Sequence, residues 1–220
     1  SFPTRRSSDL GPYCVGKSSV IAELSKKLAV GFNNKVVIAR HPGSTLLGTA
    51  LRNLVLFPTK TLGVDTKVEP ISQQLMMIAD YMQFYREYKE YLENNIVLAD
   101  RHTYISSMIY GVASGISRDN LQSIWNGLEY PKADFLIMLT ADRETLSERL
   151  AAKNDRDVFE HSDFQRRVID GYDSMLNDKQ CMLSIAQSIL VVNTSRSDVQ
   201  SAVDEVYDFV VKVHQMSLNH

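Results

Sequence analysis

The stretch Gly11-Pro12-Tyr13-Cys14-Val15-Gly16-Lys17-Ser18 fits the phosphate-binding loop pattern G-x-x-x-x-G-K-[ST]. Its glycines let the backbone curl so that successive N–H groups point at phosphate oxygens, and the following helix adds the positive end of its dipole. The lysine reaches the outer phosphates and the serine hydroxyl binds Mg²⁺. The pattern therefore predicts a nucleoside triphosphate site at Gly11, Val15, Gly16, Lys17, Ser18 and Ser19.

A loop of this kind follows a buried apolar strand, but the preceding segment reads SFPTRRSSDL. Only Phe2 and Leu10 are clearly apolar in it, and it lacks the apolar core of a secretory signal. We therefore expect residues 1–10 to be a non-native or disordered leader, with the first strand lost or degraded. Residues 11–220 are expected to form a single domain.

The bulk composition excludes several classes of protein. The chain has 220 residues, a net charge of −2 and a pI near 6.2, so nothing draws it as a whole to nucleic acid or to anionic membranes. No apolar stretch approaches the length of a membrane span. Its two cysteines, Cys14 and Cys181, lack metal-ligand spacing, and an isolated pair favours a reducing, cytoplasmic location.

Short apolar runs alternate with longer amphipathic segments along the chain. The runs are rich in β-branched residues, as in parallel strands covered on both faces, and lie at 36–39, 96–99, 135–139 and 189–192. Helical patterns lie at 18–30, 72–93, 119–128, 143–152, 162–177 and 197–213. This alternation predicts an α/β fold, with a parallel sheet flanked by helices on both faces in three layers.

Charged residues follow the apolar runs where strand ends are expected. Arg40 follows the first run, and Asp100-Arg101 follows the second. Ligands of open parallel sheets bind at the carboxyl ends of the strands. Because guanidinium groups bind phosphate through two hydrogen bonds and keep their charge, Arg40 and Arg101 predict a second phosphate facing the triphosphate.

From Gly11 to about Val213, the sequence resembles the thymidylate kinases, a family of nucleoside monophosphate kinases of the P-loop NTPase class. The resemblance rests on the phosphate loop and on motifs that follow it in order: R-x-P-G-[GS]-T at 40–45, Gly48 with Arg52, Ala79-Asp80, Asp100-Arg101, D-R-x-x-x-E at 155–160, and Phe164, Arg167 and Tyr172. The resemblance implies transfer of phosphate from ATP to a nucleoside monophosphate, most simply dTMP to dTDP. It also implies a His41–Pro42 bond in the cis form and a homodimer formed through helices.

The resemblance also implies roles for individual residues. Lys17, Arg101 and the cations Lys153 and Arg156 of a lid at about 150–161 are the implied catalytic residues. Arg149 joins the ATP-binding residues, and Mg²⁺ is bound by Ser18 and, through water, by Asp100. The implied substrate-binding residues are Tyr13, Arg40, Pro42, Arg52, Met77, Tyr81, Asp100, Arg101 and Tyr110.

Several of these positions depart from the family pattern. Tyr13 replaces an acid, Met77 replaces a phenylalanine that stacks on thymine, and Tyr81 replaces an arginine that bonds the base. The family's Tyr-Gln pair aligns with Ile109-Tyr110 or Tyr110-Gly111, without the glutamine in either case. These changes leave open another nucleoside monophosphate kinase, a deoxynucleoside kinase, or a nucleotide-binding module without catalysis.

Overall fold

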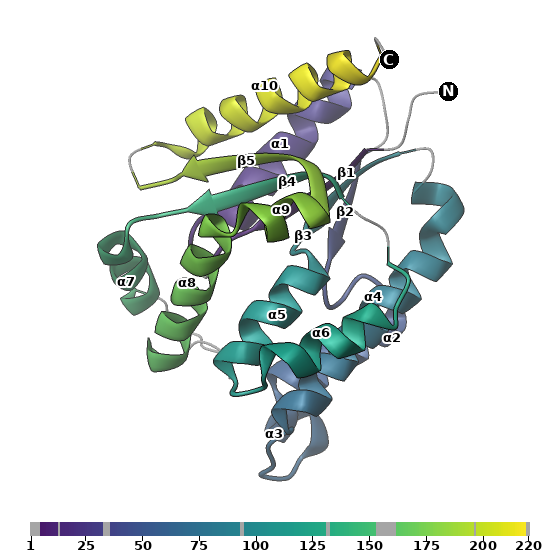
Figure 1. Cartoon of the computed structure of the whole chain (residues 1–220), viewed down its shortest axis with the longest axis vertical. Coiled ribbons are helices and arrows are strands. Elements are labelled where there is room, and N and C mark those ends of the chain that lie inside the picture. Colours follow the sequence, from purple (N-terminus) through teal and green to yellow (C-terminus); the bar gives the residue numbers. More distant parts are fainter. Residues whose placement is uncertain are drawn as a thin grey trace.

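Five parallel strands form one sheet at the centre of the computed structural model, which describes residues 5–12, 14–32, 36–92, 95–130, 133–152, 162–195 and 197–218. The strands occur in the spatial order β2-β3-β1-β4-β5 (Figure 1). Their bounds are β1 Arg5–Leu10, β2 Val36–Arg40, β3 Ile96–Asp100, β4 Ala133–Thr140 and β5 Ala186–Asn193. The four apolar runs of the sequence all lie in strands, which confirms the predicted parallel sheet.

Strand β1 corrects the expectation of disorder for residues 5–10, while residues 1–4 of the expected leader lie outside the described residues. Residues 5–10 pair with β3 on one side, where Arg5 faces Ile96, and with β4 on the other, where Leu10 faces Met138. Strand pairing uses backbone N–H and C=O groups, which every residue here provides whatever its side chain. The polar sequence therefore occupies the central position between two apolar strands, and the phosphate loop follows a strand after all.

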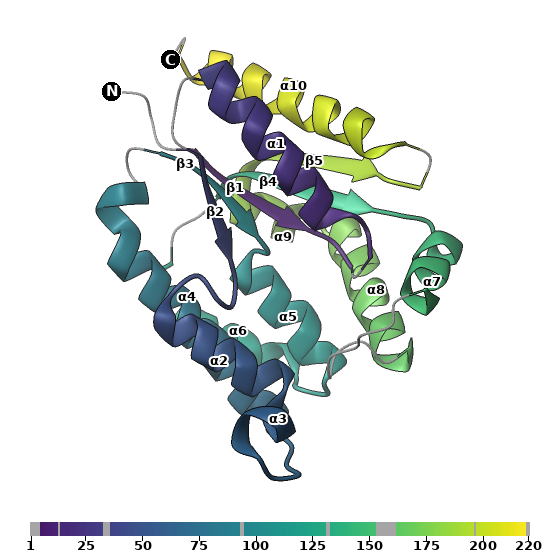
Figure 2. The same ribbon diagram turned by 180° about the vertical axis from the view of Figure 1, so that it is seen from behind.

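One face of the sheet is covered by α1 (Lys17–Phe32) and α10 (Val199–Leu218), which lie side by side (Figure 2). Val20, Leu24 and Leu28 recur at helical spacing in α1 and are buried with Val203 and Val206 of α10. This spacing places an apolar stripe of each helix against the sheet.

The opposite face is covered mainly by α4 (Pro70–Leu92), α5 (Thr103–Ala113), α8 (Ser162–Asn177) and α9 (Lys179–Ile185) (Figure 1). Ile105 of α5, Val168 of α8 and Ile185 of α9 are buried in one cluster with Leu136 and Met138 of β4. Helices α2 (Leu46–Leu56), α3 (Pro58–Leu62), α6 (Arg118–Asn126) and α7 (Arg143–Ala151) complete the fold. Helices on both faces confirm the three-layer α/β architecture.

The sequence did not predict α2, α3, α5 or α9. Helix α5 shows why, because nearly all of its side chains are buried and its sequence TYISSMIYGVA has no polar face. A helix that is buried all round has no amphipathic period to detect. No helix in the described parts of the chain is long and apolar enough to cross a membrane.

The sheet brings the candidate site residues to one edge. Strands run parallel, so their carboxyl ends meet there, and Arg40 is the register partner of Asp100. The phosphate loop begins one residue after Leu10, the last residue of β1. The segments after β1, β2 and β3 therefore converge at the edge where ligands of such sheets bind.

Candidate active site

The phosphate loop has the strained, close-packed backbone that its sequence predicts. Gly11 has φ 154°, and a Cβ atom built there would lie 2.3 Å from the carbonyl oxygen of Leu139, so no side chain fits. Gly16 and Cys14 have φ 97° and 62°. Left-handed backbone at these two positions curls the loop before α1 begins at Lys17.

Lys17 lies folded against its own loop. Its side chain is 8% exposed, and its Nζ donates to the carbonyls of Gly11 at 2.9 Å and Pro12 at 2.7 Å. Ser18 and Ser19 follow at the first turn of α1, and both line the pocket in front of the loop. A positive charge, hydroxyl groups and a helix N-terminus thus meet at one point, a combination that suits phosphate groups.

The outer side of the loop is held by residues from two other elements. Val15 is fully buried, and its carbonyl accepts from Thr194 Oγ1 at 2.9 Å. Arg149 of α7 donates to the carbonyl of Cys14 at 3.3 Å and to Thr194. Sequence reasoning missed Thr194, although it directly follows β5, where the same rule that singled out Arg40 and Arg101 applies.

The turn after β2 is fixed from beneath by Asp80 of α4. The His41–Pro42 bond is cis, as the resemblance implied. Asp80 is fully buried, and its carboxylate accepts from the Gly43 N–H at 3.3 Å and lies 3.2 Å from His41 Nδ1. Arg52 Nη1 donates to the Pro42 carbonyl at 3.0 Å. These contacts define the path of the turn that begins at Arg40.

Arg40, Asp100 and Arg101 meet at the ends of β2 and β3. Arg40 Nε lies 3.7 Å from Asp100 Oδ2, while Asp100 Oδ1 is buried and has no hydrogen-bond partner among the described residues. Arg101 has φ 83° and donates through Nη1 to the hydroxyl of Tyr110 at 3.0 Å. Left-handed backbone at a non-glycine residue is uncommon and concentrates at functional sites.

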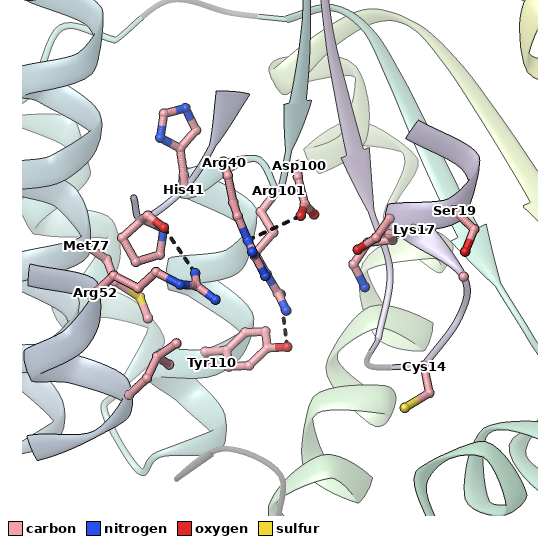
Figure 3. Close-up of a pocket in the computed structure, with 14 residues that line it drawn as sticks. Cys14, Lys17, Ser19, Arg40, His41, Arg52, Met77, Asp100, Arg101 and Tyr110 are labelled. Carbon is pink, nitrogen blue, oxygen red and sulfur yellow. Dashed lines mark hydrogen bonds and ion pairs between the residues drawn. The ribbon is translucent and has the colours of Figure 1, made fainter. Parts of the chain in front are cut away.

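One pocket of about 360 Å³ joins the two regions. Figure 3 shows Lys17 on one side of it and Arg40 with Arg101 on the other. Most of the predicted site residues line this pocket: Gly16, Lys17, Ser18, Ser19, Arg40, Pro42, Arg52, Met77, Asp100, Arg101 and Tyr110. Cys14, His41 and Leu56 line it as well, without having been singled out in the sequence. The lining residues include four lysine or arginine side chains and one carboxylate, so the pocket has an excess of positive charge and suits an anionic ligand.

Other predicted residues lie elsewhere. Gly11 and Val15 are buried within the loop, and Arg149 contacts its outer side. Tyr81 is not among the lining residues, because its ring packs edge-on against His41 at 5.2 Å and Trp125 at 6.4 Å between centroids. Tyr13, Lys153, Arg156 and most of the expected lid at 150–161 lie outside the described residues.

His102, next to Arg101, is not placed for acid–base chemistry. Its side chain is 3% exposed, and neither ring nitrogen has a hydrogen-bond partner in the described part of the chain. Burial, with a contribution from His41, lowers the pKa of His102 to about 4. The imidazole is therefore neutral near pH 7 and packs as a core side chain.

A comparison with known families agrees with this geometry. The family model described as thymidylate kinase matches residues 12–195. The chain belongs to the thymidylate kinase family. It is similar to a thymidylate kinase of Caldicellulosiruptor saccharolyticus, with 31% identity over 207 residues, 90% of this chain and 92% of the relative. A thymidylate kinase of Malacoplasma penetrans is 28% identical over 178 residues, 76% of this chain and 79% of the relative.

A solved structure shares the fold. The thymidylate kinase of Candida albicans superposes with a TM-score of 0.74 at 19% identity, covering 96% of this chain and 94% of that one. Membership in the thymidylate kinase family makes this chain a phosphotransferase that uses ATP. The pocket between the loop and the arginines is its candidate active site.

Proposed function

We propose that this thymidylate kinase family member transfers the γ-phosphoryl group of ATP to the phosphate of dTMP, releasing ADP and dTDP. One observation carries the proposal beyond family membership. The phosphate loop with Lys17 and the arginines Arg40 and Arg101 face each other across a single pocket. Such an arrangement holds two phosphate groups in line, which is the main requirement for phosphoryl transfer.

At the donor end, the loop N–H groups and the N-terminus of α1 bind the polyphosphate, and Lys17 adds a full positive charge. Ser18 lines the pocket, and the buried Asp100 Oδ1 has no hydrogen-bond partner among the described residues. This donor set fits Mg²⁺ held by the Ser18 hydroxyl and, through water, by Asp100. When bound there, Mg²⁺ neutralises charge on the phosphate oxygens.

At the acceptor end, Arg40 and Arg101 bind the phosphate of dTMP and place one of its oxygens toward the donor. Their guanidinium groups form paired hydrogen bonds to phosphate and stay charged at any working pH. No general base is needed, because the attacking phosphate oxygen is already an anion. The neutral, buried His102 is consistent with this mechanism.

The base rests near Met77 and Tyr110, which line the same pocket. Roles for Tyr13 and Tyr81 in base recognition stay predictions, as do those of Lys153 and Arg156 as lid cations over the transferring group. We also propose a cytoplasmic location, which fits two cysteines, Cys14 and Cys181, that are not joined in a disulfide. A homodimer formed through helices is likewise a prediction, which light scattering of the purified chain measures.

The test is an ADP-release assay with ATP and each ribo- and deoxynucleoside monophosphate, with thymidine as the unphosphorylated acceptor. We expect dTMP to give the highest kcat/KM and thymidine to give no turnover. Lys17→Ala lowers turnover by about 10³-fold or more, because the transition state loses a charge that binds the transferred group. Lys60→Ala is the matched control, because Lys60 is exposed on α3 and does not line the pocket.

The possible results separate the alternatives. Turnover that requires thymidine rather than dTMP assigns a nucleoside kinase. ATP binding with no acceptor-dependent ADP assigns a binding module. A higher kcat/KM with a nucleoside monophosphate other than dTMP leaves the assignment as a kinase in place and changes the assigned base of the acceptor. Full turnover by the Lys17 variant contradicts the role of the loop.

A further inference from the structure

We propose that Thr194 is a positioning residue for ATP: its hydroxyl holds the phosphate loop in the conformation that directs the N–H groups of Val15 and Gly16 at phosphate. This inference rests on the proposed function, because it takes the polyphosphate of ATP as the loop's ligand. Thr194 does not line the pocket, and the proposed effect runs through its contacts with the loop and with Arg149.

The contacts of Thr194 assign its single hydroxyl hydrogen. Oγ1 lies 2.9 Å from the carbonyl oxygen of Val15 and 3.1 Å from that of Thr140. The Thr140 carbonyl already accepts the backbone N–H of Thr194 at 2.8 Å. The hydrogen is therefore donated to Val15, the nearer acceptor. Thr194 is 6% exposed and Val15 is fully buried, so water is a poor substitute for this bond.

The bond orients the next amide. In a trans peptide unit, the C=O and the N–H point in opposite directions. With the Val15 carbonyl directed outward to Thr194, the N–H of Gly16 is directed to the opposite side, toward the pocket that Gly16 lines. The Cys14 carbonyl is likewise held by Arg149 Nη1 at 3.3 Å, so the N–H of Val15 is directed the same way. Two successive N–H groups on one side form an anion-binding concavity.

This conformation needs support from outside the loop. Cys14 has φ 62°, which is unfavourable for a residue with a side chain, and Gly16 has φ 97°. Thr194 supports both neighbouring peptide units. It holds the Val15 carbonyl directly, and it accepts from Arg149 through Oγ1 at 3.3 Å and through its backbone carbonyl at 3.1 Å. One hydroxyl thus joins β5, α7 and the loop.

The experiment uses Thr194→Val, which replaces the hydroxyl with a methyl group of the same shape, and Thr194→Ser, which keeps the hydroxyl. The probe is magnesium tripolyphosphate, which has no base or sugar and so reports on the loop. Its affinity is measured by titration calorimetry and by competition with ATP. Thr140→Val is the control, because the Thr140 hydroxyl lies 3.4 Å from the Val192 carbonyl and has no described contact with the loop.

We expect Thr194→Val to lower the affinity for tripolyphosphate and to raise KM for ATP, each by roughly tenfold, because the buried Val15 carbonyl loses its hydrogen-bond donor. For Thr194→Ser and Thr140→Val, we expect the tripolyphosphate affinity and KM for ATP to stay within about twofold of the values for the unaltered chain. KM for dTMP stays unchanged in all three variants, because Arg40 and Arg101 lie at the other end of the pocket.

Three results overturn the proposal. The first is an unchanged tripolyphosphate affinity in Thr194→Val, and the second is a loss of affinity in Thr194→Ser as large as that in Thr194→Val. The third is a rise of KM for dTMP as large as the rise of KM for ATP, which indicates general damage to the fold. If Thr194→Val does not fold, Thr194→Ala takes its place against Thr194→Ser. Failure of the proposed function shows separately, as an absence of dTMP-dependent ADP release by the unaltered chain.

Discussion

Tyr110→Phe measures how much one hydroxyl contributes to the acceptor end of the pocket. The Tyr110 oxygen accepts from Arg101 Nη1 at 3.0 Å, and the guanidinium carbon lies 5.2 Å from the ring centroid. Tyr110 is 3% exposed, so a phenylalanine ring fills the same space. The substitution removes the hydrogen bond and leaves the packing and the cation–π contact in place.

The expected size follows from the charge and the burial of the pair. A hydrogen bond to a charged group contributes about 1.5–3 kcal/mol. Arg101 is only half-buried, so water replaces part of the lost bond, and the cost falls near the lower end of that range. A loss of about 1.4 kcal/mol corresponds to a tenfold decrease in kcat/KM.

The assay varies dTMP at saturating ATP, and then ATP at saturating dTMP. We expect kcat/KM for dTMP to fall about tenfold and KM for ATP to stay unchanged, because the loop is untouched. Tyr104→Phe is the matched control, since the Tyr104 hydroxyl lies on the same helix but donates to Gln122 at 2.7 Å, away from the pocket lining. An effect within twofold on dTMP, or an equal effect on ATP, would refute the role assigned to Tyr110.

Two further predictions concern stability. Gly11→Ala forces a methyl group to within 2.3 Å of the Leu139 carbonyl oxygen at φ 154°, and we expect it to lower the free energy of unfolding by about 1–3 kcal/mol in urea titrations. Gly127→Ala has its nearest neighbour at 3.6 Å and is expected to leave stability unchanged; an equal loss there contradicts the packing argument. The pKa of His102 is lowered from 6.5 to about 4. Between those values the unfolded chain binds a proton at His102 that the folded chain does not. The contribution of His102 to the free energy of unfolding is therefore fully present above pH 6.5 and decreases by about 3 kcal/mol as the pH falls to 4. Comparing His102→Gln with the unaltered chain at pH 7 and pH 5 measures this contribution, and an equal pH dependence in both would contradict it.

The sequence was informative where a residue pattern has a single physical reading. The phosphate loop requires glycine at two strained positions, and the structure has φ 154° and 97° there. Four apolar runs predicted four of the five strands, because strands covered on both faces are apolar throughout. The long helices with a polar face were also predicted, and the helix over 162–177 has the predicted bounds.

The sequence was uninformative where tertiary context decides. Strand β1 has a polar sequence, yet its backbone pairs with β3 on one side and β4 on the other. Nearly all side chains of helix α5 are buried, so its sequence lacks a detectable amphipathic period. Tyr81 keeps the helical spacing of a pocket residue, but its ring packs against His41 and Trp125 instead.

By itself, therefore, the sequence determined the chemistry: a loop for polyphosphate, and arginines at strand ends for a second phosphate. Only the tertiary structure decided which distant groups share one space, because such contacts depend on strand order rather than on local pattern. It placed Lys17 opposite Arg101, Asp80 beneath the turn at Gly43, and Thr194 behind the loop across 179 residues of chain.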